Sequence, residues 1–265
     1  MTSRLYRDSG VVLRTFRLGE ADRIVVMLTR DNGKVRAVAK GIRKTRSKFG
    51  GRLEPLSHVN IQLYRGRELD IVNQVESVDA AGSVFGDLDA MTDASAILEA
   101  VDLLVPDREP VPDLYRMVVG VRQTLMERPS MLVMPAFLWR LLAHEGVRPS
   151  LDTCVVCASS VDIDEVSGLD IDQGGVCCRG CRGGTAVSRP ALALLRDIME
   201  GRLGRALDEA HAIHVARAAS PGEGAGGGGH RDGDPVAGEV AALATKAFEH
   251  HIERRLRSAS LFERR

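Results

Sequence analysis

All five cysteines of this 265-residue chain lie between residues 154 and 181. Four of them form two C-x-x-C pairs, with twenty residues between the pairs. This arrangement is typical of a four-cysteine zinc ribbon, because the x₂ spacing lets both sulfurs of a pair reach one tetrahedral Zn²⁺ at about 2.3 Å. We therefore predict one structural Zn²⁺, bound in a ribbon over residues 151–185 by Cys154, Cys157, Cys178 and Cys181.

The fifth cysteine, Cys177, offers an alternative third ligand through a C-x-x-x-C pair, although the x₂ spacing favours Cys178. Four sulfur ligands leave no open position for water or substrate. The H-E-x-x-H metalloprotease pattern fails, since Arg148 stands where a second histidine is needed after His144. Signatures of nucleotide-binding and serine-hydrolase sites are missing as well. We expect a binding protein and no enzymatic activity.

A second chemically distinctive segment, residues 41–52, is rich in lysine and arginine and has glycines near both ends. Such a segment reads as an exposed loop whose cations can follow a phosphate backbone. Phe49 lies among these cations, and Tyr64 is in a nearby strand. Phe49 either stacks on a base, as in single-strand binders, or anchors the loop to the core. The predicted phosphate contacts are Arg14, Arg23, Arg36, Lys40, Arg43, Lys44, Arg46, Lys48, Arg65 and Arg67.

Charge is unevenly distributed, although the chain as a whole has no net charge. Residues 1–80 contain sixteen basic and nine acidic side chains, a net of +7, and residues 81–265 balance this with −7. A local positive field attracts polyanions. The alternative is a solvated basic face with no partner.

Period-two alternation in the first 80 residues predicts five short strands, over 10–16, 23–29, 34–40, 58–64 and 68–78. Asp31-Asn32-Gly33 marks a hairpin turn. In the third strand, the pattern directs Lys34, Arg36, Val38 and Lys40 to one face, and Val35, Ala37 and Ala39 to the other. Five antiparallel strands suit a small barrel, either an OB-fold or an SH3-like barrel.

From about residue 82 the apolar spacing becomes helical, so the predicted fold class is α+β with an all-α C-terminal domain. We place the domains at 1–80 and 81–265, with helices over 92–104, 113–128, 134–145, 189–200, 203–218 and 239–258. Residues 219–238 hold eight glycines, and we predict a flexible insertion there. No run of about 18 apolar residues exists, and the N-terminus lacks a signal-peptide pattern, so we expect a cytoplasmic, nucleoid-associated protein without a membrane partner.

Several segments taken together resemble the bacterial RecO family of recombination mediators. The likeness covers most of the chain, except for the glycine-rich insertion. It is carried by residues 6–13, 18–24, 33–44 and 53–56, by the two cysteine pairs with Gly174-Gly175 before the second, and by residues 248–258.

The resemblance implies an N-terminal OB-fold, a helical C-terminal domain and, in many members, a zinc site. It also implies binding to single- and double-stranded DNA and annealing of complementary strands. The implied partners are RecR and the C-terminal tail of single-strand-binding protein, with RecA loaded indirectly. The alternative function is a zinc-ribbon adaptor that acts mainly through protein partners in transcription or repair.

Overall fold

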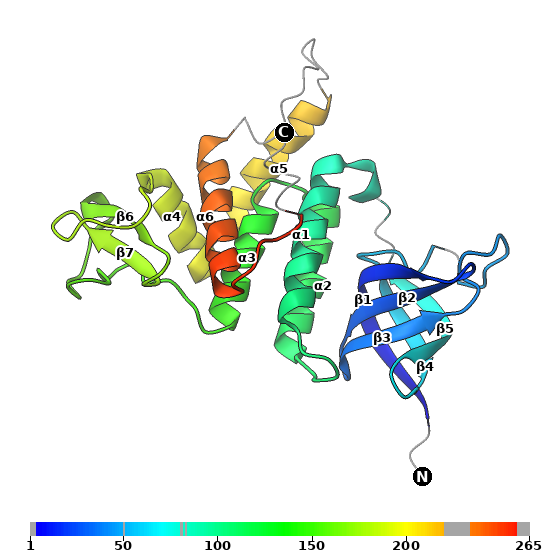
Figure 1. The fold of residues 1–265 in the computed structure, drawn as a ribbon. Coiled ribbons are helices and arrows are strands. Elements are labelled where there is room, and N and C mark those ends of the chain that lie inside the picture. Colours follow the sequence, from blue (N-terminus) through cyan, green and yellow to red (C-terminus); the bar gives the residue numbers. More distant parts are fainter. Residues whose placement is uncertain (1–3, 50, 80–81, 83, 220–233, 259–265) are drawn as a thin grey trace. The chain divides into compact units, whose positions relative to one another are not determined.

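The computed structural model describes residues 4–49, 51–79, 82, 84–219 and 234–258 (Figure 1). The chain divides into two units, residues 1–126 and 127–265. The first unit therefore includes two helices beyond the predicted boundary at residue 80, which stays a prediction from sequence. Within the described residues, no helix is long and apolar enough to cross a membrane.

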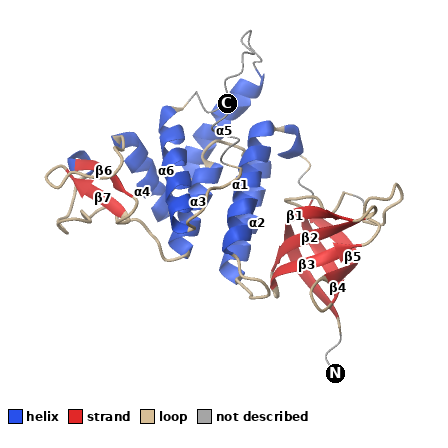
Figure 2. Ribbon diagram, in the orientation of Figure 1, coloured by secondary structure: helices blue, strands red, loops and turns tan. Residues whose placement is uncertain are grey.

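The first unit is built on a closed barrel of five strands, drawn in red in Figure 2. Around the barrel the order is β1-β2-β3-β5-β4, and β1 also pairs with β4 to close it. β3 and β5 pair in parallel, and the other neighbours are antiparallel. This connectivity is an OB-fold, which confirms the predicted fold. The strands are β1 (Leu5–Leu18), β2 (Asp22–Thr29), β3 (Gly33–Ala39), β4 (His58–Tyr64) and β5 (Asp70–Asp79).

Alternation along the strands fills the barrel, because every second side chain points inward. The interior is lined mainly by β-branched and aliphatic residues, and Phe49 and Leu53 from the β3–β4 loop also enter it. Strand members of this core are Val12, Val25, Met27, Val35, Ala37, Ala39, Val59, Ile61, Leu63 and Val72.

Two helices complete the first unit, α1 (Leu88–Leu104) and α2 (Pro112–Glu127), after a short 3₁₀ turn, η1 (Val84–Gly86). Asp87 caps α1 by accepting hydrogen bonds from the backbone N–H groups of Asp89 and Ala90. α1 packs on β1. In α2, the buried Arg122 donates from Nε to the Leu56 carbonyl at 2.8 Å, which ties this helix to the β3–β4 loop.

The second unit combines helices with a small two-stranded sheet. Helices α3 (Val133–His144), α4 (Arg189–Glu200) and α6 (Pro235–His251) pack on one another, and α5 (Gly204–Ala219) follows α4 in sequence. Between α3 and α4 lie η2 (Ile163–Glu165), β6 (Val166–Asp170) and β7 (Gly175–Cys178), with β6 and β7 antiparallel. The helical unit with a cysteine-bearing ribbon is the predicted architecture.

The last helix corrects the sequence prediction at both of its ends. It begins at Pro235, so residues 235–238, assigned to the glycine-rich insertion, form its first turn. Asp234 explains the early start, because its side chain accepts from the N–H groups of Val236 and Ala237, and proline suits the first helical position. The helix stops at His251, and Glu253 has a positive φ. Residues 220–233 of the predicted insertion lie outside the described residues.

Candidate metal centre and nucleic-acid interface

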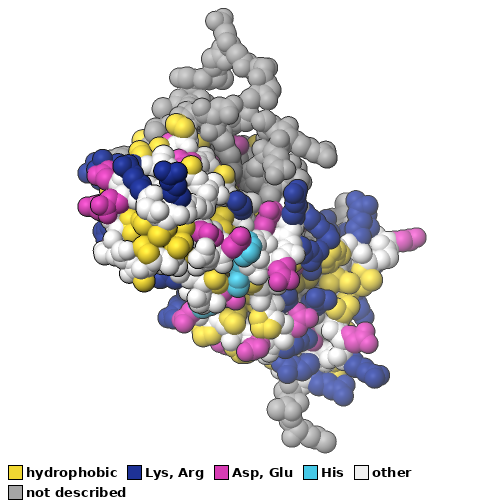
Figure 3. Space-filling view, turned by 60° about the vertical axis from the view of Figure 1, so that its left-hand side comes forward, with side chains coloured by type: hydrophobic (Ala, Val, Ile, Leu, Met, Phe, Trp, Pro, Cys, Tyr) yellow, Lys and Arg dark blue, Asp and Glu magenta, His cyan; other side chains and the backbone are white. Residues whose placement is uncertain are grey.

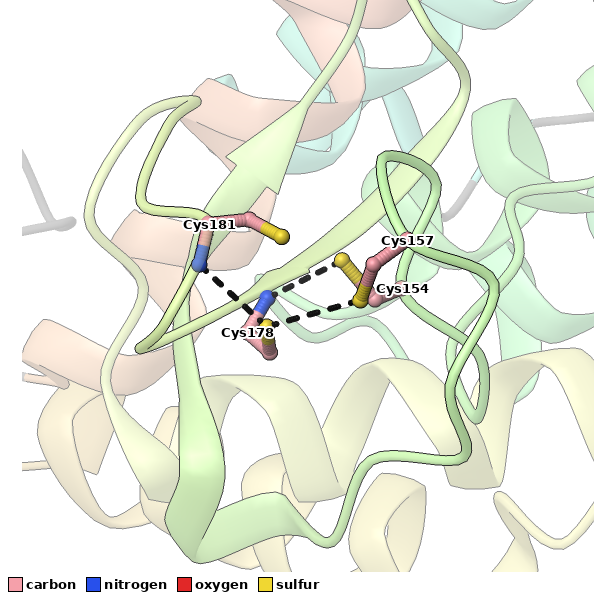
Figure 4. Close-up of side chains that lie close together, drawn as sticks. All are labelled: Cys154, Cys157, Cys178 and Cys181. Carbon is pink, nitrogen blue, oxygen red and sulfur yellow. Dashed lines mark hydrogen bonds between the residues drawn. The ribbon is translucent and has the colours of Figure 1, made fainter.

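The structure brings four of the five cysteines together (Figure 4). Cys154 and Cys157 lie on the turn that precedes the ribbon sheet, and Cys178 and Cys181 lie at the end of β7 and just beyond it. Their sulfurs all lie within 4.8 Å of one another, and no disulfide joins them. Four sulfurs around one Zn²⁺ at about 2.3 Å stand roughly 3.8 Å apart. The Sγ atoms of Cys157 and Cys178 are 3.8 Å apart, so the cluster fits a tetrahedral thiolate site.

Hydrogen bonds favour the thiolate form of Cys154 and Cys157, whereas those between Cys181 and the sulfurs of Cys157 and Cys178 raise the pKa of Cys181. The N–H of Cys178 donates to Sγ of Cys154 at 3.4 Å, and the N–H of Cys181 donates to Sγ of Cys178 at 3.4 Å. Donors from Cys157, Cys178 and Val156 lower the pKa of the Cys154 thiol to about 6. The hydroxyl of Ser159 lowers the pKa of Cys157. Thiolates are the form that binds a metal, so these bonds prepare the site for a soft cation.

Cys177 is excluded from the cluster by the strand that carries it. Successive side chains of a strand point to opposite faces, so Cys177 and Cys178 of β7 point in opposite directions. Cys177 is fully buried, and burial raises the pKa of its thiol. Its Sγ lies so close to Gly183 that a Cβ there would be 3.3 Å away. Cys177 therefore acts as a small apolar side chain.

The loop between β3 and β4 carries a dense group of exposed cations. We call Lys40, Arg43, Lys44, Arg46, Lys48 and Arg52 the basic loop, and all six are exposed. Among the described residues, none of them forms an ion pair with a carboxylate. Three donate to backbone carbonyls instead: Arg43 to Glu20 at 2.9 Å, Lys48 to Asn73 at 2.9 Å, and Arg52 to Phe49 at 3.2 Å. Figure 3 shows many Lys and Arg side chains, in dark blue, on the barrel unit.

Three of the predicted phosphate contacts on strands are instead paired with acids. Arg14 forms an ion pair with Asp102 at 2.8 Å, and Arg23 forms one with Glu54 at 2.7 Å. Arg36 lies 3.6 Å from Asp107. Arg65 and Arg67 are exposed near the start of β5; the Arg65 guanidinium donates to Asn32 Oδ1 at 2.9 Å and lies over the ring of Tyr6. The predicted set therefore separates into two groups. Arg14, Arg23 and Arg36 on strands β1–β3 are paired with acids, and the other seven, five of them in the basic loop, have no acid partner among the residues that the structure describes.

Burial decides between the two alternatives for Phe49 and sets Lys34 apart from the other cations of β3. Phe49 is 1% exposed in the barrel core, so it anchors the loop and has no free face for a base. Lys34 does not share an open face with Arg36, because Lys34 is buried and its ammonium donates to the Asp102 carbonyl at 2.8 Å. It also lies 3.6 Å from the carboxylates of Asp102 and Asp107. The burying residues come from α1 and the segment after it, about seventy positions away in sequence.

Sequence reasoning also missed a buried ionic network in the barrel. Asp70 is fully buried at the start of β5, and Arg108 donates to both of its oxygens, each at 2.8 Å. The hydroxyl of Tyr6 and the N–H of Gly66 donate to the same carboxylate. Burial by itself raises the pKa of Asp70, but these donors outweigh it and leave that pKa below its usual value. Arg108 has a positive φ of 65°. No pattern in the sequence predicts that Arg108 pairs with Asp70.

These features define a class: an OB-fold protein with an unpaired basic loop, joined to a helical unit with a four-cysteine cluster. The family model described as "Recombination protein O N terminal" matches residues 1–81, and the model described as "Recombination protein O C terminal" matches residues 86–219. The chain belongs to the RecO family, which gives it a role as a mediator in DNA repair and recombination.

Proposed function

We propose that this chain binds single- and double-stranded DNA through the basic loop and anneals complementary strands without catalysing a reaction. Annealing needs no active site. It needs a surface that neutralises two polyanions, so that complementary bases can approach one another. The predicted absence of enzymatic activity is part of this proposal.

One observation carries the proposal: six exposed cations lie in a single loop of an OB-fold, and none has a carboxylate partner among the described residues. A cation that is already paired gains little from a phosphate, because its carboxylate must first be displaced. The acid-paired Arg14, Arg23 and Arg36 are therefore weaker contacts in this proposal than the basic loop. Arg65 and Arg67 extend the cationic surface from the start of β5.

The cysteine cluster would hold one structural Zn²⁺ through Cys154, Cys157, Cys178 and Cys181. Support comes from the sulfur separations and from the N–H donors to Cys154 and Cys178. With four sulfur ligands the ion supplies folding energy to the ribbon and has no position for a substrate.

Family membership supports the finer partners of the proposal. We propose that the chain acts with RecR and with the C-terminal tail of single-strand-binding protein, and that RecA is loaded on the resulting DNA. Of these partners, DNA is the one to which this proposal assigns a binding surface, the basic loop.

The test is DNA binding as a function of salt. If about four to six phosphates are neutralised on a single strand, log K should fall with log salt with a slope of about −3 to −4. The triple change Arg43→Ala, Lys44→Ala and Arg46→Ala should reduce the magnitude of this slope by about 2. It should also weaken binding to all sequences alike and slow annealing of strands coated with single-strand-binding protein.

A matched control removes three cations that already have acid partners, namely Arg128, Arg189 and Arg202 of the second unit. This control should leave the slope and the annealing rate unchanged. Equal losses in both triple variants would show a general charge effect and would refute the role of the basic loop. Absence of salt-dependent binding by the wild-type protein would refute the proposal as a whole.

A further inference from the structure

An apolar row crosses the outer surface of the OB-fold. Register places Phe16 of β1 opposite Ile24 of β2, and Ile24 opposite Val38 of β3. The same row continues from Val38 to Ile71 of β5 and from Ile71 to Tyr64 of β4. Neighbouring strands stand about 4.7–4.9 Å apart, so the five side chains follow one another around the outside of the closed barrel. We call these five residues the outer row.

The outer row faces away from the core. Strand neighbours of the other four members, namely Val25, Ala37, Ala39, Leu63 and Val72, point into the barrel. Thr15, which precedes Phe16, pairs with the inward-pointing Val25, so all five members point outward. Phe16 is 44% exposed and Tyr64 is 41% exposed, whereas Ile24, Val38 and Ile71 are half-buried. Single exposed apolar side chains are ordinary, but neighbouring apolar side chains that include two exposed rings offer a surface to a ligand.

Phe16 is held in place by a neighbour. The guanidinium of Arg14 lies over its ring, 4.7 Å from the centroid, and the same guanidinium pairs with Asp102 of α1 at 2.8 Å. A cation over one ring face is attractive and restricts the ring. Part of the ring remains exposed to solvent. Arg14 is thus a positioning residue for Phe16.

Cations border the outer row. Arg36 and Lys40 lie two residues before and after Val38, about 6.6 Å away along the strand direction, and both are exposed. The basic loop begins at Lys40 and reaches β5 where Lys48 donates to the Asn73 carbonyl, two residues after Ile71. An occupant of this strip therefore meets apolar and aromatic side chains in the middle and positive charge along the edge. Unpaired bases on a phosphate backbone have this combination of properties, and an apolar peptide does not.

We propose that the outer row is a base-stacking platform, with Phe16 as its principal residue, which makes the barrel prefer single-stranded to double-stranded nucleic acid. This rests on the proposed function and deepens it, because the basic loop alone contacts phosphates and cannot distinguish the two forms. In a duplex the bases are stacked on each other and cannot reach Phe16. Phe49, for which stacking was one of two alternatives, is in the core, and Phe16 takes the stacking role in this proposal.

The experiment compares three probes of equal length, about 16 nucleotides, at fixed ionic strength: a mixed-sequence single strand, its duplex, and an abasic strand with the same phosphates. Phe16→Ala in the full chain should weaken single-strand binding by about 5- to 150-fold, from the 1–3 kcal/mol of one stacked base. Binding of the duplex and of the abasic strand should stay within about twofold of wild type.

Phe16→Trp should restore single-strand binding, because the larger ring keeps the stacking face. Val78→Ala, which removes another exposed apolar side chain of β5, should change nothing. Wild-type affinity for the duplex and the abasic strand tests the basic loop independently. If both probes bind but Phe16→Ala leaves single-strand affinity unchanged, or weakens all three probes equally, the platform is refuted while the proposed function survives. If the outer row instead bound an apolar peptide, Phe16→Ala would leave single-strand affinity unchanged.

Discussion

Serine substitution of adjacent cysteines, Cys178 and Cys177, tests the metal centre most directly. The two residues differ by one position in sequence and point to opposite faces of β7. In the structure Cys178 Sγ lies 3.8 Å from Cys157 Sγ, whereas Cys177 is buried against Gly183. Cys178→Ser should therefore remove a metal ligand, and Cys177→Ser should not.

The magnitude follows from the number of ligands. Structural Zn²⁺ sites contribute about 10–16 kcal/mol of apparent binding free energy at neutral pH. If four sulfurs share this equally, the loss of one costs roughly 2.5–4 kcal/mol, or about a 100- to 1,000-fold weaker Zn²⁺ affinity. Cys177→Ser instead buries a hydroxyl, which lowers the free energy of unfolding by about 1–3 kcal/mol with the metal content unchanged.

The assay measures the zinc content of each purified variant and its affinity in competition with a chromophoric chelator. Urea unfolding of each variant supplies the free energy of unfolding. Wild type and Cys177→Ser should each hold one Zn²⁺ per chain. A Cys177→Ser protein that loses its zinc, beside a Cys178→Ser protein that keeps it, would refute the assignment of ligands.

Two further predictions concern the barrel unit. Arg108→Ala leaves the buried carboxylate of Asp70 without its cation and should lower the free energy of unfolding by about 3–5 kcal/mol at pH 7, measured in urea. Because the folded-state pKa of Asp70 is below its usual value of about 4, the stabilisation is present above that pH and is lost as the pH falls through the folded-state pKa. The difference between variant and wild type should therefore shrink in acid, and a constant difference would contradict the pairing. Burial and the Arg122 cation lower the pKa of His58 in the folded state. On acidification His58 is therefore protonated at a higher pH in the unfolded chain than in the folded one, and the free energy of unfolding should fall as the pH drops below about 6.5. His58→Gln should reduce this fall between pH 7.5 and pH 5.5; an unchanged profile would contradict it.

The sequence was sufficient for features set by local spacing. Alternating apolar residues predicted the strands of the barrel, and His58–Tyr64 is predicted to the residue. The C-x-x-C spacing predicted which four sulfurs meet. Helix α4 also matches its prediction, since Ser188 caps it, a proline follows in the first turn, and Gly201 ends it in a left-handed conformation.

Features that depend on residues far apart in sequence could not be predicted in this way. Alternation gave Lys34 and Arg36 equivalent outward positions. In the structure Lys34 is buried and lies 3.6 Å from Asp102 of α1, and Arg36 pairs with Asp107, which follows α1. Composition likewise placed Phe49 among cations, and its burial depends on how the loop packs on the barrel core. A count of basic residues measures total charge, whereas partner binding depends on the charges left without acids.

The short parallel contact between β3 and β5 has a mechanical consequence. Only two residue pairs, Ala37 with Asp70 and Val38 with Ile71, join these strands in the described register, compared with seven or more at each antiparallel seam of the barrel. The β3–β5 contact therefore has the fewest paired residues of any strand pair in the barrel. Asp70, which is paired with Arg108, lies at the end of this contact. A strand of nucleic acid stacked across Val38 and Ile71 would bridge the seam from outside, so ligand and barrel would rigidify together at the weakest join of the fold.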